Sequence, residues 1–567
     1  MAKAEATVEE LVGMIERGEL RLPEMQRRYV WRSTRVRDLL DSLYRGYPSG
    51  VILLWDTDEK VPQQGFAVSQ QGNPYLSTRL LLDGQQRLTS LSAVIRGEPV
   101  YARGRKRPID ILFNLEHPDQ LAVVTEVNED ADGNGEEDDI DNNDIDASED
   151  ELQRRFDKMT FLVATRKIES LPHWVKVTDV FQTDEDAPFL ARAGIEKISD
   201  PLYTKYSQRL ARLRGVRKYI YRMDVLERSM SYDEVTEIFV RVNSLGAKLR
   251  GSDLALAQIT AKWKTSLATF QAFQTKCAKE GFDLDLGLHL RNMIVFATGQ
   301  SRFLTVGNLT VDQLKSAWKV SGEGMEFAIN FLKNNAGIYD PVLLSSPFLM
   351  VALAYFGYKR DYNITSEESA RLRYWALVAN AKGRFSRGSS ETLLDQDVAT
   401  LRDGGGVDML IDRLRSQVGR LDISPDELEG RTQRSALFKT MFLAFRSSGA
   451  KDWRSNLLIA LDHSGTQHRL QFHHIFPKAL LKRSDITREA DDISNLAFIG
   501  GRTNRAISDK SPLIYFPPLI EKSGQNAFDA QCIPTESELL DITKYKEFLS
   551  ERRKRITSRL NEYLETS

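Results

Sequence analysis

Two adjacent histidines and two downstream asparagines are the residues of this chain best suited to chemistry. The histidines lie within Phe472–Pro477 (FHHIFP), Asn495 precedes the apolar run Leu496–Ile499, and Asn504 precedes a basic residue. Hydrolysis of a phosphodiester needs a base that activates water and a hard cation that neutralises the developing charge. Imidazole and carboxamide side chains supply both functions.

The elements that must position these side chains follow from the apolar pattern. Neighbouring side chains of an extended segment point to opposite faces, so His473 and His474 can serve different partners, one a metal and the other a water. The run Leu496–Ile499, followed by two glycines, predicts the return strand of a hairpin, and the segment from Thr503 predicts a helix start. We therefore expect a strand, strand, helix unit.

A chance histidine pair in a buried strand is the alternative interpretation. Four of the seven histidines, His463, His468, His473 and His474, fall within twelve residues, and the asparagines follow in register. This clustering favours a chemical site, although short motifs carry a false-positive risk. We expect His463 and His468 to lie at the surface or behind the site.

The pattern resembles the HNH, or ββα-metal, nuclease family, including the variant carried by RNA-guided CRISPR nucleases. The resemblance implies that His474 is the general base, that His473 and Asn504 hold one divalent cation, and that Asn495 ties down the hairpin loop. Many family members have Asp at the position of His473. Imidazole accepts transition metals whereas Mg²⁺ prefers oxygen ligands, so Mg²⁺ and Mn²⁺ both stay open as the cation.

A second candidate element lies where a buried strand runs into a helix. The strand Leu80–Leu82 precedes Asp83–Arg87 (DGQQR), and apolar residues then recur at helical spacing. Such a junction suits phosphate because backbone N–H groups and the positive end of the helix dipole face the turn, and Gly84 permits close approach. Arg87 can add a bidentate contact. On these grounds alone an ordinary structural turn explains the pattern equally well.

Three amino-terminal segments together resemble the ParB-like amino-terminal domain of GmrSD-type restriction proteins. They are the segments 26–31 (QRRYVW), 83–87 (DGQQR) and 239–246 (FVRVNSLG). The carboxy-terminal segments 473–477 (HHIFP) and 495–499 (NLAFI) resemble the nuclease domain of the same proteins. The resemblance covers nearly the whole chain, with both halves in the expected order, and includes SspE-like members that act with backbone phosphorothioation.

This resemblance implies a nucleoside triphosphate as cofactor, with GTP preferred to ATP or CTP, and NTPase activity. It implies modified or phage DNA as substrate. The implied nucleotide site is lined by Asp83, Gly84, Gln85, Gln86, Arg87, Gln26, Arg27, Arg241 and Asn243. Gln26 and Arg27 can instead belong to a sensor of DNA modification. Without the resemblance, Arg241 would be an ion-pair partner and Asn243 part of a helix terminus.

The net charge of −2 conceals a strong asymmetry along the chain. The segment 128–151 holds thirteen Asp or Glu and no Lys or Arg, so the remainder carries +11. We expect a disordered acidic insertion there, because its start imitates a calcium loop but places Asp141 where Glu is required. The basic remainder suits a nucleic-acid partner. Candidate phosphate contacts beside the histidine motif are Arg502, Arg505 and Lys510.

Length and composition bound the architecture. A chain of 567 residues exceeds one hydrophobic core, and no apolar run reaches the roughly 18 residues of a membrane span. Cys277 and Cys532 are too few for a disulfide framework, so a cytoplasmic protein is expected. We predict an α+β multidomain fold: residues 1–253 as an α/β nucleotide-binding sensor interrupted by 128–151, residues 254–421 as a helical linker, and residues 422–567 as the HNH domain.

The function predicted from the sequence is a metal-dependent endonuclease of antiphage defence, regulated by nucleotide and by DNA modification. A nucleotide-switched DNA-binding regulator with an inactive nuclease site is the main rival, and an RNA-targeting toxin is another, because phosphate contacts carry no sugar information. A homo-oligomer and other defence components are possible partners; a membrane is not expected.

Overall fold

The computed structural model describes residues 2–565 except for 25, 27–28, 30, 32, 58–62, 72–78, 102–107, 119–158, 246–250, 466, 485 and 487–488. The chain divides into two compact units, Met1–Leu267 and Ala268–Ser567. Both contain helices and strands, so the mixed α and β class is confirmed. Arg27 and the acidic segment 128–151 lie outside the described residues.

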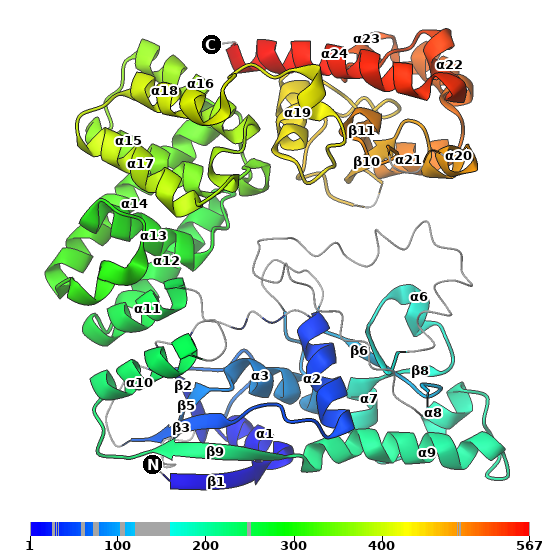
Figure 1. Cartoon of the computed structure of the whole chain (residues 1–567). Helices are drawn as coiled ribbons and strands as arrows, with labels where there is room; N and C mark the ends of the chain where they lie inside the picture. Colours follow the sequence, from blue (N-terminus) through cyan, green and yellow to red (C-terminus); the bar gives the residue numbers. More distant parts are fainter. Residues whose placement is uncertain are drawn as a thin grey trace. The chain divides into compact units, whose positions relative to one another are not determined.

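The first unit is built on a six-stranded mixed sheet (Figure 1). Its strands, in spatial order, are β1 (Ala2–Thr7), β9 (Ile220–Leu226), β3 (Ile52–Asp56), β5 (Arg79–Asp83), β2 (Leu20–Pro23) and β4 (Gln63–Gln64). β5 runs parallel to β2 and antiparallel to β3, whereas β3 runs parallel to β9. The carboxyl ends of β2 and β5 and the amino ends of β3 and β9 therefore meet at one edge.

Both faces of this sheet are buried, which explains the continuous apolar runs of β3 and β5. Ile52 and Leu54 pack against one helical layer, while Leu53 and Trp55 pack against the opposite layer. The first layer includes α1 (Val8–Glu16), α2 (Ser33–Arg45) and α3 (Gln85–Arg96). The second includes α10 (Tyr232–Leu245) and α11 (Gly251–Lys262).

A small three-stranded sheet completes the first unit. It has the order β7 (Phe161–Val163), β6 (Ile111–Asn114) and β8 (Trp174–Lys176). Helix α6 (Arg166–Glu169) lies between β7 and β8 in the chain, and α7 (Val177–Gln182), α8 (Ala187–Arg192) and α9 (Pro201–Arg214) follow β8. The α9 helix leads through a 3₁₀ turn back into β9 of the large sheet.

The second unit is mostly helical up to about residue 447, as its apolar spacing predicts. Its first helices are α12 (Ser266–Lys279), α13 (Leu286–Thr298), α14 (Val311–Asn334), α15 (Phe348–Lys359), α16 (Ser366–Ala381), α17 (Ser390–Arg402), α18 (Val407–Val418) and α19 (Ala436–Ser447). The remainder comprises β10 (Leu470–His474), α20 (Lys478–Arg483), β11 (Leu496–Gly500), α21 (Gly501–Ile507), α22 (Pro512–Ser523), α23 (Asn526–Asp529) and α24 (Tyr545–Glu565).

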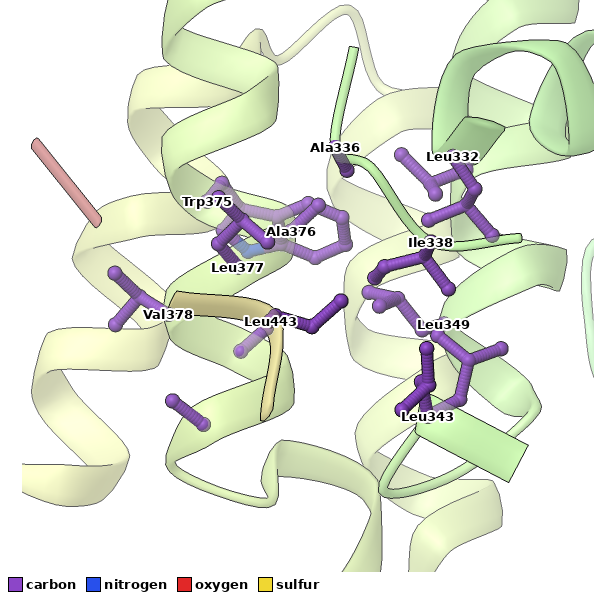
Figure 2. Packing of buried hydrophobic residues seen from close by; sticks show 14 of the residues in the cluster. Leu332, Ala336, Ile338, Leu343, Leu349, Trp375, Ala376, Leu377, Val378 and Leu443 are labelled. Atoms are coloured by element: carbon purple, nitrogen blue, oxygen red, sulfur yellow. The ribbon is translucent and has the colours of Figure 1, made fainter. Parts of the chain in front are cut away.

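One hydrophobic core joins the helical region to the carboxy-terminal region. Figure 2 shows Leu443 of α19 among Trp375, Leu377 and Val378 of α16, and the same cluster extends to Phe498 of β11. The division therefore differs from the three units expected. The expected boundary at residue 253 falls inside α11, and residues 268–567 form a single unit because the apolar faces of α16, α19 and α24 cover one another.

Among the residues that the structure describes, none of the helices combines the length and the apolar character that a membrane crossing requires.

Candidate functional site

The two-histidine motif lies on an antiparallel strand pair followed by a short helix. β10 and β11 place His473 opposite Ala497 and His474 opposite Leu496, and α21 begins directly after β11. The connection between the strands is long and holds α20 and a 3₁₀ turn, Ile493–Asn495. The expected strand, strand, helix arrangement is present.

His473 points into the interior of the second unit. Its ring is 3% exposed, its Nδ1 lies 2.8 Å from Asn504 Oδ1, and its Nε2 lies 3.2 Å from the Tyr515 hydroxyl. Burial lowers the pKa of His473 to about 4, because desolvation penalises the imidazolium. The ring is therefore neutral at physiological pH and keeps one nitrogen lone pair for a ligand.

The side chain of Asn504 is oriented by a hydrogen bond from its amide nitrogen and by the position of its residue in the first turns of α21. Its Nδ2 donates to Gln471 Oε1 at 2.7 Å, which leaves Oδ1 facing His473. The helix start is held by Asp452, whose carboxylate accepts from the Gly500 backbone N–H and from the Thr503 hydroxyl. Burial alone would raise the pKa of Asp452, but these hydrogen bonds and those of Ser455 lower it.

His474 faces the opposite side of the strand and is half-buried. Its Nε2 lies 3.0 Å from Asp491 Oδ1, and the same oxygen lies 3.1 Å from Lys478 Nζ. The hydrogen bond from His474, together with Lys478, lowers the pKa of Asp491 to about 2, so the carboxylate is ionised and can only accept. The proton of a neutral His474 is thereby held on Nε2, and Nδ1 keeps its lone pair for a water.

Asn495 is fully buried and makes three hydrogen bonds to the backbone. Its Oδ1 accepts from the Phe476 N–H at 2.9 Å, and its Nδ2 donates to the carbonyls of Phe476 and Ala490. The side chain thus joins the segment after His474 to the segment that carries Asp491. This is the loop-fastening contact that the resemblance implied.

The described residues hold no cluster of three or more His, Cys, Asp or Glu side chains able to bind a metal. The pair formed by His473 and Asn504 nevertheless suits a divalent cation, because a neutral imidazole nitrogen and an amide oxygen converge within 2.8 Å. Remaining coordination positions would fall to water and to phosphate oxygens of a substrate, as is common for ions held by few protein ligands.

Arg502, Arg505 and Lys510 are exposed on α21 and the turn that follows it. Arg505 Nη2 donates to Gln467 Oε1 at 3.0 Å, which orients the guanidinium across the helix surface. Lys510 Nζ contacts the Ala506 carbonyl at 3.3 Å. These three cations share the short element that carries Asn504, and their exposure suits contacts with backbone phosphates.

The DGQQR segment forms the expected strand, glycine, helix junction in the first unit. Gly84 has φ 102° and caps α3, and a Cβ there would lie 2.4 Å from Ile52 Cδ1. Arg87, however, turns back into the protein: it donates to the carbonyls of Ser49 and Val51 and pairs with Asp83 at 3.0 Å. A phosphate contact by Arg87 would have to replace these bonds.

The other residues expected at the nucleotide site have mixed placements. Gln85, Gln86 and Gln26 are buried; Gln86 Oε1 accepts from the Trp31 N–H, and Gln26 Nε2 donates to the Leu81 carbonyl. Arg241 is exposed on α10 and pairs with Glu237 one turn earlier. The side chain of Asn243 and the whole of Arg27 lie outside the described residues.

Sequence reasoning missed four residues that build the histidine site. Asp491 and Gln471 lie near the motif in the chain, and the acidic pair before Asn495 was a usable signal for Asp491. Tyr515 and Arg552 are far from the motif. No local pattern marks Tyr515, and Arg552 stands in the basic run 552–555 (RRKR), which predicts a surface contact with phosphate and not a buried residue. Arg552 is fully buried and donates to the carbonyls of Ser494 and Leu496, on either side of Asn495.

Residues 8–260 match the family described as the GmrSD restriction endonuclease N-terminal domain. The match covers nearly all of the first unit and supports a protein of the GmrSD restriction endonuclease type. DNA is the substrate that a restriction endonuclease family implies.

An uncharacterised protein of Methanocaldococcus jannaschii is 22% identical to this chain. The similarity covers 90% of this chain and 86% of the relative, so it extends through both units.

Proposed function

We propose that this protein is a DNA endonuclease of the HNH type that hydrolyses phosphodiester bonds of foreign DNA. The observation that carries the proposal is the division of labour between adjacent histidines of β10. His473 is buried and converges with Asn504, whereas His474 is half-buried and hydrogen-bonded to Asp491. A regulator without nuclease activity would not need this pairing.

In the proposed reaction His474 acts as general base. Asp491 holds the proton on Nε2, so Nδ1 receives a proton from the attacking water as the water oxygen bonds to phosphorus. The bond between phosphorus and one ester oxygen of the DNA backbone breaks in the same displacement, and the leaving oxygen takes a proton from solvent to become a hydroxyl. His473 and Asn504 would hold a divalent ion, Mg²⁺ or Mn²⁺, which when bound stabilises the charge that develops on the phosphate oxygens. Arg502, Arg505 and Lys510 bind flanking phosphates and fix the strand in register.

The amino-terminal domain is the proposed site of regulation by a nucleoside triphosphate, with GTP preferred to ATP or CTP, and by DNA modification. The positive end of the α3 dipole, where Gly84 caps the helix without a side chain, supports phosphate binding beside Arg87. A bound phosphate would draw Arg87 away from the carbonyls of Ser49 and Val51 and so move that turn. Such a movement can couple nucleotide binding to DNA cleavage only if the protein binds DNA with different affinities before and after the turn has moved.

The test is cleavage of modified and unmodified phage or plasmid DNA with Mg²⁺ or Mn²⁺, with and without GTP, ATP or CTP. His474→Ala should lose about 10²- to 10⁴-fold in cleavage rate, the contribution of a general base, while DNA binding is retained. His468→Ala, which removes an exposed histidine of the same unit, is the matched control and should cut normally. Full cutting by the purified His474→Ala protein would refute the site.

The nucleotide arm is read in the same assay. A cleavage rate that does not change with any of the three nucleotides would remove the regulatory part of the proposal and leave the nuclease part standing. If DNA stays intact under every condition and RNA is cut, the same chemistry acts on RNA and the proposed substrate is wrong.

A further inference from the structure

The Tyr515 hydroxyl lies between His473 and a backbone carbonyl. It is 3.2 Å from His473 Nε2 and 2.9 Å from the Ile475 oxygen, and the tyrosine is 4% exposed. The ring of Trp453 packs against both side chains, edge-on to His473 at 5.8 Å and stacked on Tyr515 at 6.5 Å. The hydroxyl thus has two polar partners, and its ring is packed against Trp453.

The hydrogen bonds of Tyr515 determine the tautomer of His473, and therefore which ring nitrogen carries a lone pair. The Ile475 carbonyl can only accept, so the Tyr515 O–H donates to it, and the hydroxyl oxygen then accepts from His473 Nε2–H. Nδ1 keeps its lone pair and faces Asn504. Because the Asn504 amide N–H₂ donates to Gln471, its Oδ1 also presents a lone pair, and two acceptor atoms meet at 2.8 Å.

We propose that Tyr515 is a positioning residue that fixes His473 as an Nδ1 ligand, and that the resulting nitrogen and oxygen pair selects Mn²⁺ or a similar first-row transition ion over Mg²⁺. The inference rests on the proposed function of this site. The lone pairs of His473 Nδ1 and Asn504 Oδ1 face each other without a proton between them, so they repel. A cation bound by both atoms would remove this repulsion. Imidazole nitrogen suits transition ions, whereas Mg²⁺ favours oxygen ligands and keeps its waters.

The first test is Mn²⁺ and Mg²⁺ binding to the full-length protein, measured by calorimetry and, for Mn²⁺, by loss of the free-ion electron paramagnetic resonance signal. The wild type should bind Mn²⁺ more tightly than Mg²⁺. Tyr515→Phe should weaken Mn²⁺ binding by about 10- to 100-fold, the usual effect of removing the partner of a ligating histidine. Equal binding of Mn²⁺ by the wild type and Tyr515→Phe would overturn the assignment.

Tyr545→Phe is the matched control. Tyr545 is equally buried in the same core, and its hydroxyl donates to a backbone carbonyl, that of Glu489, at 2.9 Å. The control loses the same group without touching a histidine, so its Mn²⁺ affinity should equal that of the wild type. A loss matching that of Tyr515→Phe would mean that a general loosening of the core explains both.

His473→Asp separates the ion preference from the role of Tyr515. The substitution replaces the nitrogen donor with a carboxylate, so the ratio of Mg²⁺ to Mn²⁺ affinity should rise relative to the wild type. A wild type that binds Mg²⁺ as tightly as Mn²⁺ would overturn the preference. Failure of the parent proposal has a different signature, because Mn²⁺ then binds as described, yet no nucleic acid is cut. Cutting that depends on His474 although no metal binds would instead overturn the metal assignment and leave the general base standing.

Discussion

Asp491 illustrates how one neighbouring side chain can give a histidine its chemical role. The carboxylate accepts from Nε2 of His474 and is itself held by Lys478 at 3.1 Å. A histidine in solution exchanges its proton between both nitrogens, whereas His474 keeps Nδ1 as the basic atom. His473 also keeps its proton on Nε2, but its partners are an amide and a hydroxyl instead of a carboxylate, so the two rings differ in surroundings although they share a tautomer.

At this scale we predict that Asp491→Asn slows cleavage by about 10- to 100-fold, part of the roughly 10²- to 10⁴-fold that a general base supplies. The amide can present N–H as well as oxygen, so the proton of His474 is no longer held on Nε2. Single-turnover cleavage measures the rate, and DNA binding by anisotropy should be unchanged. Asp462→Asn, an exposed acid of the same unit, is the control, and an equal effect there would contradict the role of Asp491.

The Asp491 carboxylate also predicts how the free energy of unfolding depends on pH. The pKa of Asp491 is lowered from 3.8 to about 2, chiefly by the hydrogen bond from His474, so its folded state binds fewer protons than its unfolded state. The stabilisation is therefore complete above the unfolded pKa and disappears as the pH falls toward 2. Urea midpoints of the wild type should exceed those of Asp491→Asn near neutral pH, with the gap closing on acidification. If the difference between the two urea midpoints widened on acidification, the pKa of Asp491 would be raised by folding and not lowered.

At the scale of elements, the β10–β11 pair is enclosed by side chains on both faces. Phe472 and Phe498 pack edge-on or tilted against Phe438 of α19, while His473 faces Trp453 and Tyr515 on the other side. Asn495 and the buried Arg552 then hold the backbone between the strands. Strand alternation sends the two histidines to opposite faces, and the packing of Trp453 and Tyr515 then encloses His473 while His474 reaches the surface.

The strand, glycine, helix junction of the first unit makes a second prediction. Gly84→Ala should destabilise that unit by more than the roughly 1–3 kcal/mol of a strained left-handed residue, because the new Cβ would also meet Ile52 at 2.4 Å. Gly194→Ala is the matched control in the same unit, since Gly194 has φ 81° with nothing within 4 Å of an added Cβ. Thermal unfolding of both variants measures the difference, and equal losses would show that the contact with Ile52 relaxes freely.

At the scale of the whole molecule, the strand pair that carries the two histidines is part of a larger helical unit. The core that holds Phe498 of β11 continues into Trp375 of α16 and Leu332 of α14. The two units are continuous in the chain, and the similarity to the archaeal relative extends through both.

We therefore predict that a fragment of residues 422–567 will not fold, whereas a fragment of residues 264–567 will. The shorter piece exposes the apolar faces of α19 and α24 that pack on α16, and exposed patches of this kind aggregate. Size-exclusion chromatography and backbone hydrogen exchange of β10 measure the outcome. A monomeric 422–567 fragment with protected β10 amides would show that the smaller piece has a sufficient core.

Local patterns did not predict helix α20 between the two strands, but they were enough to predict the strands and the following helix of the histidine site, the strand, glycine, helix junction at Gly84 and the helical character of residues 254–421. These depend on residues close together in the chain, such as alternation in a strand or the missing Cβ of Gly84. The opposite orientations of His473 and His474 belong to the same class, because alternation along one strand determines them. The loop contact of Asn495 was implied by the family resemblance, and its partner Phe476 lies 19 residues away in the chain.

Only the tertiary structure brought Tyr515 to His473 across 42 residues and Arg552 to the backbone beside Asn495 across more than 50. It also turned Arg87 toward the carbonyls of Ser49 and Val51 and merged two expected domains into one core. A side-chain donor such as an arginine pairs in the folded protein with a buried acceptor that lies within hydrogen-bonding distance, because burying an unpaired polar group costs free energy. Which groups come within reach depends on packing between distant segments, and no local pattern records it.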